Sequence, residues 1–121
     1  MRIERFEDIE AWKEARELVK IVYSIFKNTK DFGFKDQIQR SAISIMSNIA
    51  EGFDRGSNKE FIKFLIIARA STSEVKSLLY VAVDAGYLNQ EMFAIVSSQC
   101  IKISNLINGF IRYLRKSERK C

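Results

Sequence analysis

The sequence predicts an all-α protein whose fold is an antiparallel, up-down-up-down four-helix bundle. Apolar residues recur every three or four positions along most of the chain, which is the spacing of one face of an α-helix. Proline, which breaks helices in their interior, is absent from all 121 residues. Short polar segments divide the pattern into four stretches, and short connections favour antiparallel neighbours. We expect one domain, residues 1–121, that ends in a basic tail at about residues 112–121.

The first half of the chain contains two predicted helices. The first covers roughly residues 8–28, where Asp8 is an acidic residue suited to a helix start. Its main apolar positions are Trp12, Ala15, Val19, Val22 and Phe26. A break follows at residues 28–33, and the second helix is expected from about residue 35. Its main apolar positions are Ile38, Ala42, Ile45 and Ile49.

The second half of the chain contains the third and fourth predicted helices. Ser57 and Glu60 match a capping box, in which Ser57 accepts from the backbone N–H of residue 60 and the Glu60 carboxylate reaches back. The third helix therefore begins there and ends near Ala85, because Gly86 is the residue type favoured just past a helix end. Asn89 is expected to cap the fourth helix. Its expected apolar positions are Met92, Val96, Gln99, Ile103, Leu106, Phe110 and Tyr113.

Composition argues against several classes of function. The chain is 47% apolar and 29% charged, which is typical of a globular protein and not of a disordered one. Histidine is absent, which removes the commonest general base and most zinc sites. Neither Cys100 nor Cys121 has metal-ligand spacing, and Cys100 is expected to be a buried apolar residue. We therefore expect a protein that is not an enzyme and that holds no cofactor and no metal.

The chain also lacks the features of a membrane protein. It has no apolar run long enough to span a bilayer, and its first residues include acids in place of a secretory signal. We therefore expect a cytoplasmic protein without membrane contacts.

The net charge of +5 is concentrated near the carboxyl terminus. Residues 1–88 carry 14 basic and 13 acidic groups, whereas residues 89–121 carry 6 basic and 2 acidic groups. One interpretation is a solvated helix end, since cations are stabilising at helix carboxyl termini. The other is a surface that binds nucleic-acid phosphates. The main candidates for nucleic-acid binding are Arg112, Arg115, Lys116, Arg119 and Lys120.

The stretch SNIAEGFDRGSNKEF, residues 47–61, interrupts the helical pattern with two glycines. Its spacing does not match a phosphate-binding loop, so Gly52 or Gly56 is expected to end the second helix before Ser57 begins the third. Arg55 and Lys59 lie beside this helix start, where an anion can bind. They are the secondary candidates for nucleic-acid contacts.

Two further expectations concern packing. Polar residues between the bulky apolar ones suggest pairs across the second and third helices, with Arg40 and Glu51 as partners of Glu74 and Arg69. The helices also carry more apolar residues than the core of one bundle requires. Some of these residues are expected to form an interface between identical subunits.

Three blocks of the sequence resemble a known family. They are FEDIEAWKEARELV, DQIQRSAISIMSNIAEGFDRGSNKEFIKFLIIARAS and DAGYL, and the run SNIAEGF followed by EFIKFL is the most specific part. The chain resembles the 23S rRNA intervening-sequence protein family of bacteria over nearly its whole length, except for the basic tail. The resemblance implies a four-helix bundle, assembly as a ring-shaped homopentamer and no established catalytic residues. The residues that correspond to the family signature, with an expected structural role, are Asn48, Glu51, Gly52, Phe53, Ser57, Glu60, Phe61 and Arg69.

These observations lead to one main functional hypothesis and one alternative. The main hypothesis is a homo-oligomeric bundle without enzymatic activity that binds RNA, such as ribosomal RNA, or a ribonucleoprotein through its basic surface. The alternative is a protein-interaction scaffold or accessory subunit that makes no direct contact with nucleic acid. In a ring of identical subunits, the cations of each turn would recur around the assembly and would act together.

Overall fold

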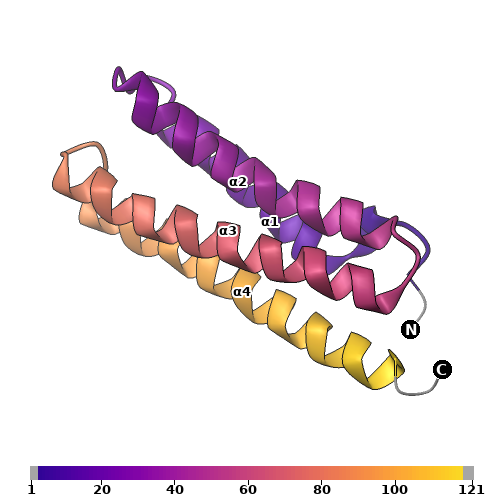
Figure 1. Cartoon of the computed structure of the whole chain (residues 1–121). Helices are drawn as coiled ribbons and strands as arrows, with labels where there is room; N and C mark the ends of the chain where they lie inside the picture. The colour runs from indigo at the N-terminus through magenta and orange to yellow at the C-terminus, as the bar shows by residue number, and fades with distance from the viewer. Residues whose placement is uncertain (1–2, 119–121) are drawn as a thin grey trace.

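The computed structural model describes the backbone of residues 3–118 and the side chains of residues 3–117. Within these residues the chain forms a short 3-10 turn, η1 (Phe6–Asp8), and four α-helices, which are α1 (Glu10–Ile25), α2 (Phe32–Phe53), α3 (Asn58–Asp84) and α4 (Gln90–Glu118). Each helix runs antiparallel to the one before it, and α4 returns alongside α1 (Figure 1). This arrangement confirms the predicted all-α four-helix fold. No helix of residues 3–118 is long and apolar enough to cross a membrane.

Side-chain caps set the starts of three helices. Ser57 accepts a hydrogen bond from the backbone N–H of Glu60 at 3.2 Å, as the capping box predicts, although the Glu60 carboxylate pairs with Lys63 instead of reaching back. Asn89 accepts from the N–H of Met92 at 2.8 Å and starts α4, again as expected. Asp31 accepts from the N–H of Phe34 at 3.2 Å. This third cap starts α2 at Phe32, three residues earlier than the periodicity alone indicates.

The first helix is shorter than the predicted range of 8–28. Residues Phe6–Asp8 form a 3-10 turn, and the extended backbone of Ile9 separates this turn from α1, which has no side-chain cap.

The carboxyl end of α3 is followed by a glycine cap. Gly86 has a positive φ of 82°, and Tyr87 N–H donates to the Ala82 carbonyl at 2.8 Å. This is the predicted glycine cap, with its backbone turned into the left-handed region.

The core runs along the bundle axis between the four helices and contains Leu18, Ile45, Leu65 and Ile103, all fully buried. The predicted apolar face of the fourth helix is partly wrong. That prediction followed a seven-residue spacing, which drifts around a straight α-helix with 3.6 residues per turn. Tyr113 is consequently 50% exposed, whereas Cys100 is buried as expected. The buried positions of α4 are Val96, Ser97, Cys100, Ile103, Ile107, Ile111 and Leu114.

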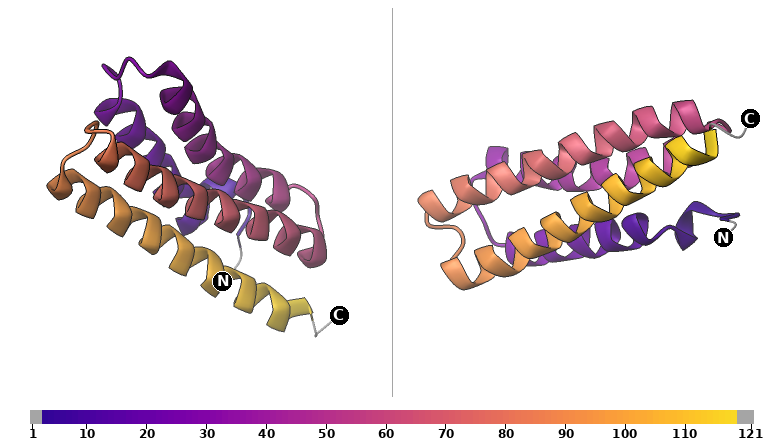
Figure 2. Two further views of the ribbon diagram at one scale, coloured as in Figure 1. Left: turned by 60° about the vertical axis from the view of Figure 1, so that its left-hand side comes forward. Right: turned by 90° about the horizontal axis from the view of Figure 1, so that it is seen from below.

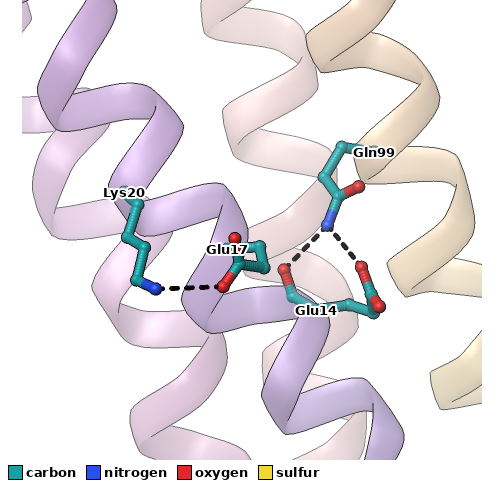
Figure 3. A network of polar contacts seen from close by, with 4 residues as sticks. All are labelled: Glu14, Glu17, Lys20 and Gln99. Carbon is teal, nitrogen blue, oxygen red and sulfur yellow. Dashed lines mark hydrogen bonds and ion pairs between the residues drawn. The ribbon is translucent and has the colours of Figure 1, made fainter.

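A polar contact joins α1 to α4 (Figure 3). The side-chain amide of Gln99 donates to both the backbone carbonyl and the Oε1 carboxylate oxygen of Glu14, each at 2.9 Å. Lys102 lies 3.3 Å from the other carboxylate oxygen. The Gln99 hydrogen bond, assisted by Lys102, holds the pKa of Glu14 below its ordinary value against the opposing effect of desolvation. A separate ion pair on the surface of α1 links Glu17 to Lys20 at 3.1 Å.

Both described ends of the chain lie at one end of the bundle. The amino-terminal segment, the α2–α3 turn and the last turns of α4 meet there (Figure 2). We call this region, residues 3–10, 53–63 and 110–117, the terminal end. The α1–α2 and α3–α4 turns lie at the opposite end, which we call the far end. The terminal end therefore carries all of the nucleic-acid candidates that lie within the described residues.

Candidate nucleic-acid interface

The two glycines near the α2–α3 turn have different roles. Gly52 lies inside α2, and a Cβ atom added there would lie 2.6 Å from Cβ of Phe64 and 2.9 Å from a ring carbon of Phe61. Its role is therefore close approach of α2 to α3 and not helix termination. Gly56 lies beyond the helix end with a φ of 87° and has open space around it, so it forms the turn. The expectation that one of the two glycines makes the turn is met by Gly56.

The start of α3 is attached to the last turns of α4. The side-chain amide of Asn58 donates to the backbone carbonyl of Leu114 at 3.1 Å. This carbonyl lies one turn before the end of α4. The bond joins the first turn of α3, which contains Lys59, to the turn of α4 that contains Arg115. Two candidate regions that are far apart in sequence thus come together.

Five exposed cations lie in or next to the turns that this bond joins, and we call them the basic face: Lys59, Lys63, Arg112, Arg115 and Lys116. The first two lie one turn apart on α3, and on α4 Arg112 lies one turn before the adjacent Arg115 and Lys116. Within the described side chains of these same turns, Glu60 is the acidic residue, and it pairs with Lys63 at 3.4 Å. The basic face therefore carries an excess of positive charge. The candidates Arg119 and Lys120 lie outside the described residues.

Arg55 is held more tightly than the other candidates. Its guanidinium group pairs with Glu51 at 3.2 Å and lies over the Phe64 ring, 4.8 Å from the ring centroid. The ion pair neutralises its charge locally, and the cation–π contact restrains the side chain. Both residues are exposed, but Arg55 is therefore less available than Lys59 to an incoming anion.

The predicted ion pairs between the second and third helices are wrong. Arg40 pairs with Asp36 at 2.8 Å, one turn away on the same helix. Glu51 likewise pairs with Arg55, and Arg69 donates to the Asn108 side chain of α4 at 2.9 Å. Long side chains reach partners at i and i+4 at low entropic cost, which explains the local pairs. The polar contact between α2 and α3 is instead the pair of hydroxyl groups of Ser44 and Ser71, 2.9 Å apart.

With this geometry in place, comparison with known proteins identifies the family. The chain matches the family described as 23S rRNA-intervening sequence protein over residues 7–109. The chain belongs to this family. It is also similar to a crystal structure of a protein of unknown function from the S23 ribosomal protein family of Bacteroides thetaiotaomicron, with a TM-score of 0.78 and 25% sequence identity. That similarity covers 84% of this chain and 97% of the other. No curated protein matches the chain.

Several signature residues of this 23S rRNA-intervening sequence protein support the terminal end. Phe61 packs edge-on against both Phe53 and Phe110, with ring centroids 6.0 and 5.2 Å away. Asn48 donates to the carbonyl and the hydroxyl oxygen of Ser44 and so orients the Ser44–Ser71 contact. The cap at Ser57, the Gly52 packing and the local pairs of Glu51 and Glu60 are likewise contacts within the bundle. Arg69 joins α3 to α4 through its hydrogen bond to Asn108.

Lys63 and Asn58 belong to this junction but are not among the candidates predicted from the sequence. Lys63 is exposed one helical turn after Lys59, so its i, i+4 spacing could have placed it on the same face. Asn58 carries no such signal, because its partner is a backbone carbonyl 56 positions later. The family match also ends at residue 109, before Arg112. The α4 part of the basic face is therefore a feature of this chain beyond the matched region.

Proposed function

We propose that this chain is a homo-oligomeric bundle without enzymatic activity that binds RNA, or an RNA–protein complex, in the cytoplasm. One observation carries the proposal, namely the hydrogen bond from Asn58 to Leu114, which joins two helix ends that both carry exposed cations. Membership of a family named for an intervening sequence in 23S rRNA supports RNA as the ligand. Ribosomal RNA is the first RNA to test.

Such a surface binds phosphates and reads little sequence. Lysine and arginine side chains release counterions when they contact the RNA backbone, and this release makes the affinity fall with salt. Sequence readout of single-stranded RNA generally requires aromatic side chains on which bases stack. In the last turns of α4, beside the basic face, Tyr113 is the one half-exposed aromatic side chain among the described residues. A single ring offers little surface for base stacking. We therefore propose phosphate contacts as the main source of affinity.

Homo-oligomerisation is part of the proposal. Large apolar side chains remain exposed on the outer surfaces of α3 and α4, whereas isolated monomers seldom leave wide apolar areas uncovered. Closed rings of identical subunits are a common way to cover such residues. The exposed apolar residues of these two helices are Ile66, Ile67, Tyr80, Val81, Ile95, Ile101 and Tyr113. A ring would also repeat the basic face once per subunit and would raise avidity.

The RNA proposal is tested by fluorescence anisotropy with a structured fragment of 23S rRNA at several salt concentrations. We expect affinity to fall steeply with salt and the double variant Arg115→Gln/Lys116→Gln to lower the logarithmic slope by about 1.4–1.8, since each phosphate contact contributes about 0.7–0.9. The matched control is Lys27→Gln/Lys30→Gln at the far end, which removes the same charge. Equal losses in both variants would show attraction by net charge alone and would contradict the proposal.

The same assay ranks two cations of the α2–α3 turn. Lys59→Gln should weaken binding more than Arg55→Gln, because the Arg55 guanidinium is already paired with Glu51. The opposite ranking would place the RNA over the outside of the turn and away from the end of α4.

The assembly is tested by light scattering at micromolar concentration. We expect a mass several times that of one chain and a shift toward the monomer in an Ile67→Glu/Ile101→Glu variant, because a charge is costly in an apolar interface. A wild-type monomer would contradict the oligomer.

The alternative function, a protein-interaction scaffold or accessory subunit, draws on the same exposed apolar side chains of α3 and α4. It would gain support if the intact oligomer bound no RNA at low salt.

A further inference from the structure

Two adjoining hollows open at the terminal end of the bundle. One has a volume of about 300 Å³ and lies between the α2–α3 turn and the last turns of α4. The other has a volume of about 330 Å³ and lies between the first turn of α1 and the α4 residues Leu106, Phe110 and Tyr113. Ile3, Phe110 and Tyr113 line both hollows, so they form one continuous groove. We call it the terminal groove.

The terminal groove exists because α4 diverges from α1. As α4 runs toward its carboxyl end it crosses toward α3 and away from the amino-terminal segment (Figure 2). The hydrogen bond of Asn58 to Leu114 holds α4 on the α3 side. Leu106 and Phe110 are consequently only half-buried, and Tyr113 is 50% exposed. The groove thus offers an apolar floor of aliphatic and aromatic side chains to solvent.

One rim of the groove is acidic. Asp8 and Glu10 line it, and both are exposed. Glu10 pairs with Lys13 at 3.5 Å across the helix surface, a contact of the exposed kind that contributes little. Asp8 takes part in none of the ion pairs formed between the described residues. An incoming positive charge would find at least one carboxylate ready to pair with it.

We propose that the terminal groove docks a segment of a partner protein in which a large apolar side chain stands next to a lysine or an arginine. The apolar side chain packs on the floor formed by Leu106, Phe110 and Tyr113, where the last two rings contact each other with centroids 6.0 Å apart, and the cation contacts Asp8 and Glu10. Interfaces of this kind derive most of their affinity from one or two apolar anchors, while charges at the rim set the orientation. The volume of each hollow falls at the lower end of the roughly 300–1,000 Å³ range of ligand pockets, which suits a few side chains.

The same features separate this groove from the proposed RNA surface. Carboxylates repel phosphates, and an apolar floor cannot replace the water around a nucleic-acid backbone. The first hollow adjoins the basic face, because Asn58 and Leu114 line it, whereas the second hollow, with Asp8 and Glu10, lies on the α1 side of α4. One end of the bundle can therefore hold RNA on the basic face and a protein segment in the second hollow. This inference is independent of the RNA proposal.

The experiment is a display selection of random ten-residue peptides on the intact protein. We expect the enriched peptides to combine a large apolar residue with an adjacent lysine or arginine. The chain has a net charge of +5, so a general attraction would favour acidic peptides, and basic enrichment would point to a local acidic site. Failure to enrich any peptide, or enrichment of acidic ones, would overturn the proposal.

Variants then locate the binding site of an enriched peptide made by synthesis. Asp8→Asn/Glu10→Gln should weaken it about threefold to tenfold, and Tyr113→Ser should weaken it by about tenfold or more. The controls are Glu91→Gln, which also removes an acid from the first turn of a helix, and Tyr23→Ser, which also removes a half-exposed tyrosine. Both controls should bind as the wild type does.

Two outcomes would assign the groove to another occupant. If the Asp8→Asn/Glu10→Gln variant changes the subunit number in light scattering, a second copy of the chain fills the groove. If the 23S rRNA fragment displaces the peptide and the Tyr113→Ser variant weakens RNA equally, the groove is part of the RNA surface. Either result would overturn the proposal.

Discussion

The phenol hydroxyl of Tyr87 donates a hydrogen bond to a carboxylate oxygen of Asp31 over 2.7 Å, and this bond joins the two turns at the far end of the bundle. The other Asp31 oxygen caps α2 through the N–H of Phe34. The Tyr87 ring also packs 5.4 Å from the Phe34 ring. One carboxylate thus starts a helix and links the first half of the chain to the second.

The Tyr87→Phe variant should lower the free energy of unfolding and weaken this link. The hydrogen bond from Tyr87, followed by the one from Phe34, holds the pKa of Asp31 below its ordinary value, while Asp31 raises the pKa of Tyr87. The bond therefore stabilises the fold between the ordinary pKa values of aspartate and tyrosine, about 3.9 and about 10. This contribution is lost as the pH falls through the lowered pKa of Asp31 or rises through the raised pKa of Tyr87. Urea unfolding at pH 7 and pH 3 measures it, and a difference between wild type and variant that is the same at both pH values would contradict the assignment.

The Gly52→Ala variant should destabilise the protein by about 1–3 kcal/mol, because the new methyl group would overlap Cβ of Phe64 at 2.6 Å. A Cβ atom cannot rotate away, so α2 and α3 must separate. Gly109→Ala is the control inside another helix, where the nearest atom is a flexible arginine nitrogen at 3.8 Å. It should stabilise by up to about 1 kcal/mol, since alanine favours helices. Urea denaturation measures both changes, and stabilisation of both variants would refute the close-approach role.

The Gln99→Ala variant should cost about 1 kcal/mol at neutral pH, because it removes the hydrogen bonds to Glu14 that join α4 to α1. The pKa of Glu14 is lowered in the folded state, so this stabilisation is present above the ordinary glutamate pKa and fades as the pH falls through the lowered one. The exposed Gln37→Ala on α2 controls for helix propensity. The pKa of Glu14, followed by NMR titration, should rise in Gln99→Ala and stay constant in the control.

Cys100 should resist thiol reagents in the folded protein. It is 1% exposed, and desolvation raises the pKa of its thiol to about 11, so almost no thiolate is present at pH 8. In a Cys121→Ser background, labelling should be slow without denaturant and fast in concentrated urea. Rapid labelling of the folded variant would show that α3 and α4 open locally around this residue. Because the folded-state pKa is raised, stability should also decline as the pH climbs above about 8.5 toward 11.

The sequence predicted the helices well where a local signal marks them. The cap at Ser57, the glycine at Gly86 and the cap at Asn89 act within a few residues of their own position, and each lies where it was expected. The start of α1 was placed two residues too early, because the extended conformation of Ile9 leaves no mark in the apolar spacing. The start of α2 was placed too late, although Asp31 provided a usable signal.

The candidate site was predictable only in part. Arg112, Arg115 and Lys116 stand out in the sequence as a run of cations, and the structure exposes all three. That Lys59 and Lys63 belong to the same surface follows from the packing of α3 against α4. The predicted pairs of Arg40 and Glu51 failed because a helix offers each long side chain a nearer partner.

The sequence alone therefore determined the number of helices, their approximate limits and the kind of charge at the end of the chain, because periodicity, caps and composition act locally. Tertiary structure decided which distant residues meet. The approach of Gly52 to Phe64, the bond from Asn58 to Leu114 and the divergence of α4 from α1 all depend on how whole helices fit together. Such contacts arise from the shapes of many side chains at once, and no short stretch of sequence encodes them.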